Sequence, residues 1–201
     1  MTIFGITEAV VAPLIRALSE AELPSSVIGE RFARAIFTGI TEPGDRIAGV
    51  LIDVLGVSQA LTAVLERWSP ERLLAAVSGA SSADVTGDDL SAAQARWRPR
   101  VNSSGAVGSL EQAVRCGAHL VSPGDREWPS GVDDLGVHRP IALWTRGNSR
   151  VLTSSQRSIA LVGARAATGY GEHVTMEVSA GLVDRGYTIT SGAAFGLFPS
   201  L

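Results

Sequence analysis

Apolar residues recur at helical spacing through the first third of the chain. One stripe runs from Val10 to Leu18, a second runs from Phe32 to Ile40, and others follow over residues 47–68. Apolar positions three and four residues apart form the buried face of an amphipathic helix. The pattern therefore predicts helices over residues 1–78.

Turn signals divide this helical region. The segment EPGD ends at Asp45, which is a favoured type of helix N-cap, and LGV at residues 55–57 places a glycine between two short helices. Such a hinge can be a helix-hairpin-helix that offers backbone amides to a DNA phosphate, but an ordinary bundle turn is the favoured interpretation. We expect residues 30–78 to form a small SAM-like or helix-hairpin-helix-like domain, with residues 1–29 as an unassigned helical extension.

Residues 79–108 are expected to be a linker and a helix, because small polar residues come first and ARWRPR follows. This segment surrounds Trp97 with Arg96, Arg98 and Arg100, a combination able to hold a phosphate backbone and stack on a base. The favoured interpretation is a solvated helix end with Trp97 packed inward. A helix closed by Gly117 and two short strands are predicted to follow.

The pattern changes to strand, helix and strand after residue 157. IALVG is a short apolar run, a helix with Val174, Val178, Leu182 and Val183 on one face follows, and YTITS comes after a closing glycine. This order predicts a βαβ unit with parallel strands. The fold class is therefore α/β: an N-terminal helical domain followed by the first βαβ part of a Rossmann-like parallel sheet, within residues 109–201.

Composition narrows the function classes. The 201 residues are 45% hydrophobic and carry a net charge of −3, and all 17 basic residues are arginine. This suits a globular protein without the overall basic excess that often marks nucleic-acid binding. One cysteine and three scattered histidines predict neither a disulfide within the chain nor a metal site. The N-terminus lacks the pattern of a secretion signal, so we expect a cytoplasmic location and no membrane contact.

Two glycine-rich loops carry the candidate chemistry. GARAATGYG follows the first strand of the βαβ unit and SGAAFG follows the second. Ligands bind at the carboxyl ends of parallel strands, where backbone amides and a helix N-terminus face an anion. Gly163, Arg165, Ser191 and Gly192 are therefore candidate phosphate contacts. The spacing fits neither the dinucleotide fingerprint nor a lysine-containing phosphate loop. A loop that only connects strand and helix remains the alternative.

These segments resemble the DNA-processing protein A (DprA/Smf) family of bacteria. IALVGARAATGYGEHV is similar to its Val-Gly-Ser-Arg segment, TITSGAAFG to its Ser-Gly-Gly-Ala-x-Gly-Ile-Asp segment, and GDREWPSGVDDLGVHRPIALWTRG to the stretch before its Rossmann domain. The resemblance spans roughly residues 30–196. It implies binding of single-stranded DNA, a homodimer, and loading of a RecA-type recombinase during natural transformation, without catalysis or a cofactor. It assigns Gly163, Arg165, Ser191 and Gly192 to the DNA phosphates.

The sequence departs from the family pattern at three places. Ala164 replaces the serine of the family pattern, Ala193 replaces a glycine of the second loop, and GLFPSL replaces Gly-Ile-Asp. We therefore expect a chain truncated within the Rossmann-like domain, with an exposed apolar strand edge and weak or absent DNA binding by itself.

Two other function classes remain open. One is a nucleotide-phosphate enzyme of the related Rossmann group with a Ser-Gly-Gly-Gly loop, which would need a catalytic arginine and glutamate that the sequence does not present. The other is a helical protein-interaction module with a relic C-terminal part.

Overall fold

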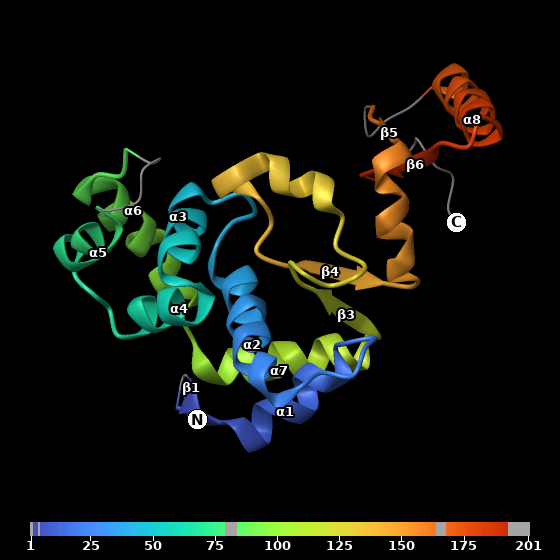
Figure 1. The fold of residues 1–201 in the computed structure, drawn as a ribbon. Coiled ribbons are helices and arrows are strands. Elements are labelled where there is room, and N and C mark those ends of the chain that lie inside the picture. Colours follow the sequence, from blue (N-terminus) through green and yellow to red (C-terminus); the bar gives the residue numbers. More distant parts are fainter. Residues whose placement is uncertain (1, 4, 79–83, 164–167, 193–201) are drawn as a thin grey trace. The chain divides into compact units, whose positions relative to one another are not determined.

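The chain forms two compact units, residues 1–149 and residues 150–201, which we call unit 1 and unit 2 (Figure 1). The computed structural model describes residues 2, 3, 5–78, 84–163 and 168–192. The first unit is mainly helical and the second is a small βαβ arrangement. The predicted α/β class is therefore confirmed.

Unit 1 begins with a short hairpin rather than with the helix that the sequence predicted. Its two-residue strands pair antiparallel, with Ile3 opposite Ile6, around Gly5 at a φ of 70°. The elements of this unit are β1 (Thr2–Ile3), β2 (Ile6–Thr7), α1 (Glu8–Ala17), α2 (Ser25–Ile40), α3 (Arg46–Leu55), α4 (Val57–Leu65), α5 (Pro70–Val77), α6 (Gly87–Trp97), η1 (Arg98–Arg100), α7 (Ser103–Arg115), β3 (Ala118–Val121), η2 (Ser130–His138) and β4 (Leu143–Arg146), where η marks a 3-10 helix.

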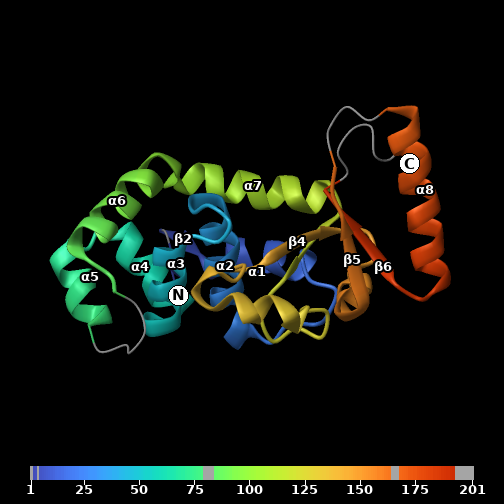
Figure 2. The ribbon, with the colours of Figure 1, turned by 90° about the horizontal axis from the view of Figure 1, so that it is seen from above.

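Helix α2 is the centre of unit 1 and packs against α1, α4 and α7 (Figure 2). The core contains the stripes predicted from the sequence, with Phe32 and Phe37 of α2, Leu51 of α3 and Leu61 of α4 buried. Burial of side chains of this size contributes about 1.5–3 kcal/mol each before conformational entropy is counted. The helical bundle is thus stabilised mainly by its apolar stripes.

Asp45 joins the start of α3 to the end of α6. One carboxylate oxygen accepts hydrogen bonds from the amides of Ile47 and Ala48 at 3.0 and 3.2 Å. The other oxygen accepts from Nε1 of Trp97 at 3.0 Å and from Arg96 at 3.2 Å. Trp97 is buried. The prediction that Trp97 packs inward is therefore confirmed, and this tryptophan is not a platform for bases.

Helices α3 and α4 meet at Gly56, whose φ of 75° and ψ of 153° suit glycine. None of the helices in the described part of the chain is by itself long and apolar enough to cross a membrane, although α3 and α4, bent by 117°, would pass that test as a pair.

Two arginines of α2 hold the hairpin of β3 and β4 against the bundle. The strands pair antiparallel from Ala118 opposite Arg146 to Val121 opposite Leu143. Arg31 donates to the carbonyl oxygen of Leu120 at 3.2 Å and also forms an ion pair with Asp125. Arg34 donates to the carbonyl oxygen of Ile141 at 3.0 Å. The two strands predicted after Gly117 are present and tied to the helical core.

Unit 2 contains the predicted βαβ arrangement. Its elements are η3 (Ser149–Arg157, whose first residue belongs to unit 1), β5 (Ser158–Leu161), α8 (Gly169–Asp184) and β6 (Thr188–Ser191). Strands β5 and β6 are parallel, in a register that runs from Ser158 opposite Thr188 to Leu161 opposite Ser191. Helix α8 lies between them in sequence and ends before Gly186.

The apolar face of α8 is only partly covered. Val174 and Leu182 are half-buried, whereas Val178 and Val183, predicted on the same face, are 43% and 57% exposed. No residue in the described part of unit 2 is buried. A sheet of two strands is too narrow to cover a helix of four turns, so part of the apolar face of α8 stays exposed.

Candidate nucleic-acid interface

The two glycine loops leave the sheet at the same edge. Leu161 and Ser191 are the last paired residues of β5 and β6, so Gly163 and Gly192 both follow at the carboxyl end of the strands. Gly163 and Gly192 are exposed and Ser191 is half-buried. The structure thus brings together three of the four residues predicted to contact phosphate.

The fourth candidate, Arg165, lies outside the described residues, as do Ala164 and Ala193. The position of Arg165 in the sequence is four residues after the end of β5 and three residues before the cap of α8. It belongs to the same loop as Gly163.

Helix α8 starts at this loop with Thr168 as its N-cap. The hydroxyl of Thr168 accepts a hydrogen bond from the amide of Gly171 at 3.2 Å. The positive end of a helix dipole attracts anions, and this end belongs to the segment that follows the glycine loop. Glu172 in the first turn already supplies one negative charge there. An arginine is therefore needed beside the dipole for strong phosphate binding.

The sequence prediction missed Tyr170. This tyrosine is the second residue of α8, and 78% of it is exposed. An aromatic ring with so much exposed surface beside glycine loops is a suitable platform for stacking a base. The available signal was its position between two glycines in GYG, because the residues at the start of a helix are seldom part of its buried face.

Gly192 is not required by the fold. A Cβ atom built on it meets no atom of the described residues within 4 Å, and its φ lies outside the left-handed range. Close approach of a ligand to the backbone is a common reason for a glycine at such a place. The position is therefore informative for function, because alanine fits the fold.

The opposite edge of the unit is closed by its own contacts. Arg157 donates to the carbonyl oxygen of Arg185 at 3.0 Å, and its guanidinium lies 4.9 Å from the ring centre of Tyr187. Arg185 itself donates to the carbonyl oxygen of Gly181 at 2.6 Å. These arginines stabilise the turn between α8 and β6, at the amino end of the strands.

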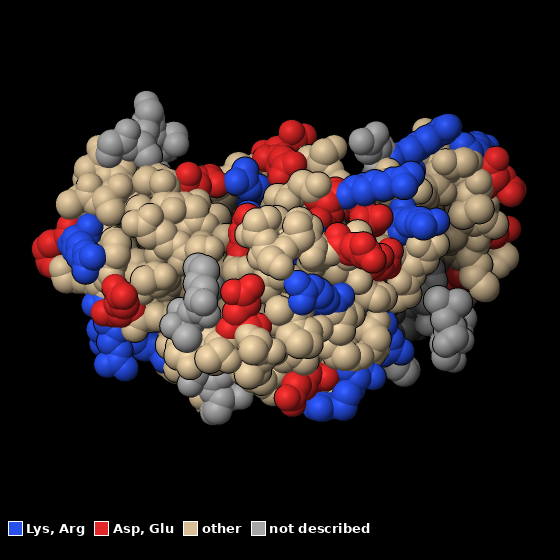
Figure 3. All heavy atoms as spheres, turned by 60° about the horizontal axis from the view of Figure 1, so that its bottom comes forward, with Lys and Arg blue, Asp and Glu red and all other residues tan. Residues whose placement is uncertain are grey.

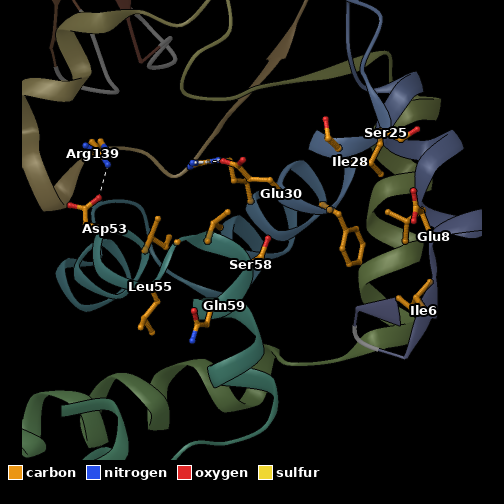
Figure 4. A pocket seen from close by; sticks show the side chains of 18 residues that line it. Ile6, Glu8, Ser25, Ile28, Glu30, Asp53, Leu55, Ser58, Gln59 and Arg139 are labelled. Atoms are coloured by element: carbon orange, nitrogen blue, oxygen red, sulfur yellow. Dashed lines mark hydrogen bonds and ion pairs between the residues drawn. The ribbon is translucent and has the colours of Figure 1, made fainter. Parts of the chain in front are cut away.

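The hinge at Gly56 borders a separate groove in unit 1 with a volume of about 690 Å³ (Figure 4). Its charged lining consists of three carboxylates and two arginines: Glu8, Glu30, Asp53, Arg34 and Arg139. Both arginines are engaged by carboxylates of the same groove, in the pairs Arg34–Glu30 and Arg139–Asp53. The groove carries no excess of positive charge for a phosphate, which favours the ordinary bundle turn over a DNA-binding hairpin.

Comparison with known proteins shows which family this part of the chain is similar to. A family model described as DNA recombination-mediator protein A matches residues 119–197. Those residues are therefore similar to that family. The match begins in β3 and extends past both glycine loops, so the predicted resemblance is confirmed for this part of the chain.

Two curated relatives are similar to part of this chain. Both are described as a putative DNA processing protein DprA, from the strains CDC 1551 / Oshkosh and H37Rv of Mycobacterium tuberculosis, and both are 38% identical over 102 residues. The alignments cover 46% of this chain and 26% of each relative. The chain thus spans about a quarter of the length of the relatives that it matches. No solved structure gives a significant match.

Proposed function

We propose that unit 2 binds the phosphate backbone of single-stranded DNA at the carboxyl edge of β5 and β6, as part of a cytoplasmic recombination mediator. The observation that carries the proposal is the placement of Gly163, Ser191 and Gly192 at one edge, in a segment that matches a DNA recombination-mediator family. Arg165 supplies the positive charge in this proposal. The site would recognise backbone and not sequence, since glycine amides and an arginine read no base edges.

Tyr170 adds a stacking surface to the proposed site. A base stacked on an aromatic ring contributes about 1–3 kcal/mol and tolerates any sequence. This fits the backbone-directed character of the glycine loops. Assembly of two copies and loading of a RecA-type recombinase are the further functions that the resemblance implies, and we propose them for the whole protein of which these residues form the DNA-binding edge.

The substitution Gly192→Ala tests whether the loop itself contacts DNA. We expect it to weaken binding of labelled oligo-dT about tenfold, because a Cβ would hold the phosphate away from the backbone amide. The melting temperature should stay unchanged, since the added atom meets nothing within 4 Å. Fluorescence anisotropy measures the binding, and circular dichroism measures the melting.

Gly108→Ala in α7 is the matched control, because a Cβ there also meets no atom within 4 Å. It should leave DNA binding unchanged. Tyr170→Ala, measured alongside, should weaken binding without lowering the melting temperature, because the side chain is so largely exposed. Unchanged binding by both Gly192→Ala and Tyr170→Ala would contradict the proposed edge.

A further inference from the structure

Arg67 has a backbone conformation that glycine normally adopts. With a φ of 55°, it is the one non-glycine residue in the described ranges with a positive φ. It follows α4 in a Schellman turn, in which the amide of Trp68 donates to Ala63 at 2.9 Å and that of Arg67 donates to Val64 at 3.2 Å. A Cβ in this conformation collides with the backbone, so glycine is preferred here.

The same chain uses glycine at the matching place in other helices. Helix α8 ends in the same two hydrogen bonds on Gly186, at a φ of 76°, and α7 ends at Gly117 with a φ of 64°. Arg67 after α4 therefore makes the folded state less stable than glycine at the same position would. A strained residue that is kept at such a cost points to a role for its side chain.

Arg67 lines a small hollow together with Arg98. The hollow has a volume of about 40 Å³, with Val64, Trp97 and Val101 as its apolar lining and Gln94 beside the two arginines. Space of this order holds about one water molecule or one phosphate oxygen. Neither guanidinium has a hydrogen bond, an ion pair or a ring contact within the described part of the chain. Two arginines whose guanidinium groups have no partner among the described residues thus border one hollow.

The charges around this hollow are already engaged. Arg96 and Arg100, the neighbours of Arg98 in ARWRPR, pair with Asp45 and Glu42. Glu66 accepts a hydrogen bond from the indole of Trp68 at 3.0 Å. Arg72 lies over the ring of that tryptophan at 3.5 Å. Glu71 lies in the first turn of α5.

We propose that Arg67 and Arg98 form a second anion site, which binds a phosphodiester group of single-stranded DNA. The proposal goes beyond the glycine-loop edge, because the site lies in unit 1 and uses none of its residues. Two guanidinium groups offer planar forks that match phosphate oxygens. Acidic and basic residues are interspersed over the face shown in Figure 3. In this proposal a local pair of arginines supplies the positive charge.

Removal of both charges should reduce the salt dependence of DNA binding. In the full chain, we expect R67Q/R98Q to lower the slope of log affinity against log salt by about 1.4, since each phosphate contact on single strands contributes about 0.7. The control R126Q/R146Q removes the same charge from two other arginines that are exposed and unpaired in the described part of the chain. It should leave the slope unchanged. Anisotropy of labelled oligo-dT over about 25–200 mM salt gives both values.

The variant Arg67→Gly separates the role of the side chain in DNA binding from the loss of stability caused by its left-handed backbone conformation. The variant should melt about 2–4 °C higher, because glycine relieves the left-handed strain, and yet bind oligo-dT more weakly with a slope lower by about 0.7. If Arg67 served only in packing, Arg67→Gly would change the melting temperature and the DNA affinity in the same direction.

Three outcomes would overturn this site: absence of any oligo-dT binding by the wild-type chain, an equal loss of slope in both double variants, or equal displacement of the DNA by polyglutamate of matched charge. Arg165→Ala is measured in parallel. If Arg165→Ala loses binding and R67Q/R98Q does not, the second site is rejected and the glycine-loop edge is supported. The reverse pattern supports the second site and rejects the glycine-loop edge.

Discussion

Replacement of Gly49 by alanine is expected to destabilise unit 1 by about 3 kcal/mol, even though alanine is the better helix former. Gly49 lies within α3, where that helix passes directly over η2. A Cβ atom at this position would lie 1.8 Å from the carbonyl oxygen of Val137 and 2.7 Å from its carbonyl carbon. These are backbone atoms, so no side chain can turn away to make room, and α3 and η2 would have to separate.

Gly39→Ala in α2 is the matched control for this prediction. A Cβ there meets no atom within 4 Å, so only helix propensity acts, and we expect a gain of about 0.5–1 kcal/mol. Urea unfolding followed by tryptophan fluorescence measures both free energies of unfolding. If Gly49→Ala were as stable as Gly39→Ala, the close packing of α3 on η2 would be wrong.

Removal of the Arg31 guanidinium, as in Arg31→Leu, is expected to cost about 3–5 kcal/mol of folding free energy. Arg31 is 8% exposed. It is bound both to Asp125 and to the carbonyl oxygen of Leu120. The substitution leaves the Asp125 carboxylate without its cation in a part-buried place, with only the amide of Ser122 donating to it at 2.7 Å. The hairpin of β3 and β4 loses one of its polar contacts with α2.

Two further variants show whether the loss of stability comes from the buried Arg31–Asp125 pair or from the removal of any charge. Arg115→Leu breaks an exposed pair with Glu111 at 3.8 Å and should cost no more than about 1 kcal/mol. Arg31→Leu/Asp125→Asn should be more stable than Arg31→Leu alone, because the uncompensated charge is gone. A double variant as unstable as the sum of its two single variants would show that the ion pair is not the reason for the loss.

The elements of this fold that could be predicted are those with a local signal. Apolar residues at helical spacing predict the core helices, and the position of Asp45 before a helix predicts its cap. The βαβ unit followed from two apolar strands and a glycine that closes the helix between them. Each of these signals depends on residues within a few positions of one another.

The contacts that could not be predicted join distant parts of the chain. Arg31 and Asp125 are 94 residues apart, and Gly49 meets a backbone segment that no periodicity describes. The hairpin at Gly5 has strands of two residues, too short for an alternating pattern. Val178 and Val183 kept their helical spacing, yet they are exposed, because spacing predicts which face is apolar and not whether anything covers it.

The candidate site was predicted more completely than its surroundings. Parallel pairing of β5 and β6 brings Gly163 and Gly192 to one edge, as the two glycine loops indicated. Tyr170 was missed because an aromatic residue at the start of a helix fits several roles until its exposure is known. The hollow of Arg67 and Arg98 was also missed, because it depends on a left-handed arginine that the sequence does not reveal.

The most direct test of the glycine-loop edge is the salt dependence of oligo-dT binding by the full chain and its Arg165→Ala and Arg185→Ala variants. The two substitutions remove the same charge, but Arg165 follows the carboxyl end of β5, whereas Arg185 lies at the amino end of β6. We predict weak binding by the wild-type chain that falls with rising salt, a slope lower by about 0.7 for Arg165→Ala, and an unchanged slope for Arg185→Ala. Equal slopes for all three proteins, or no binding at about 25 mM salt, would contradict the account.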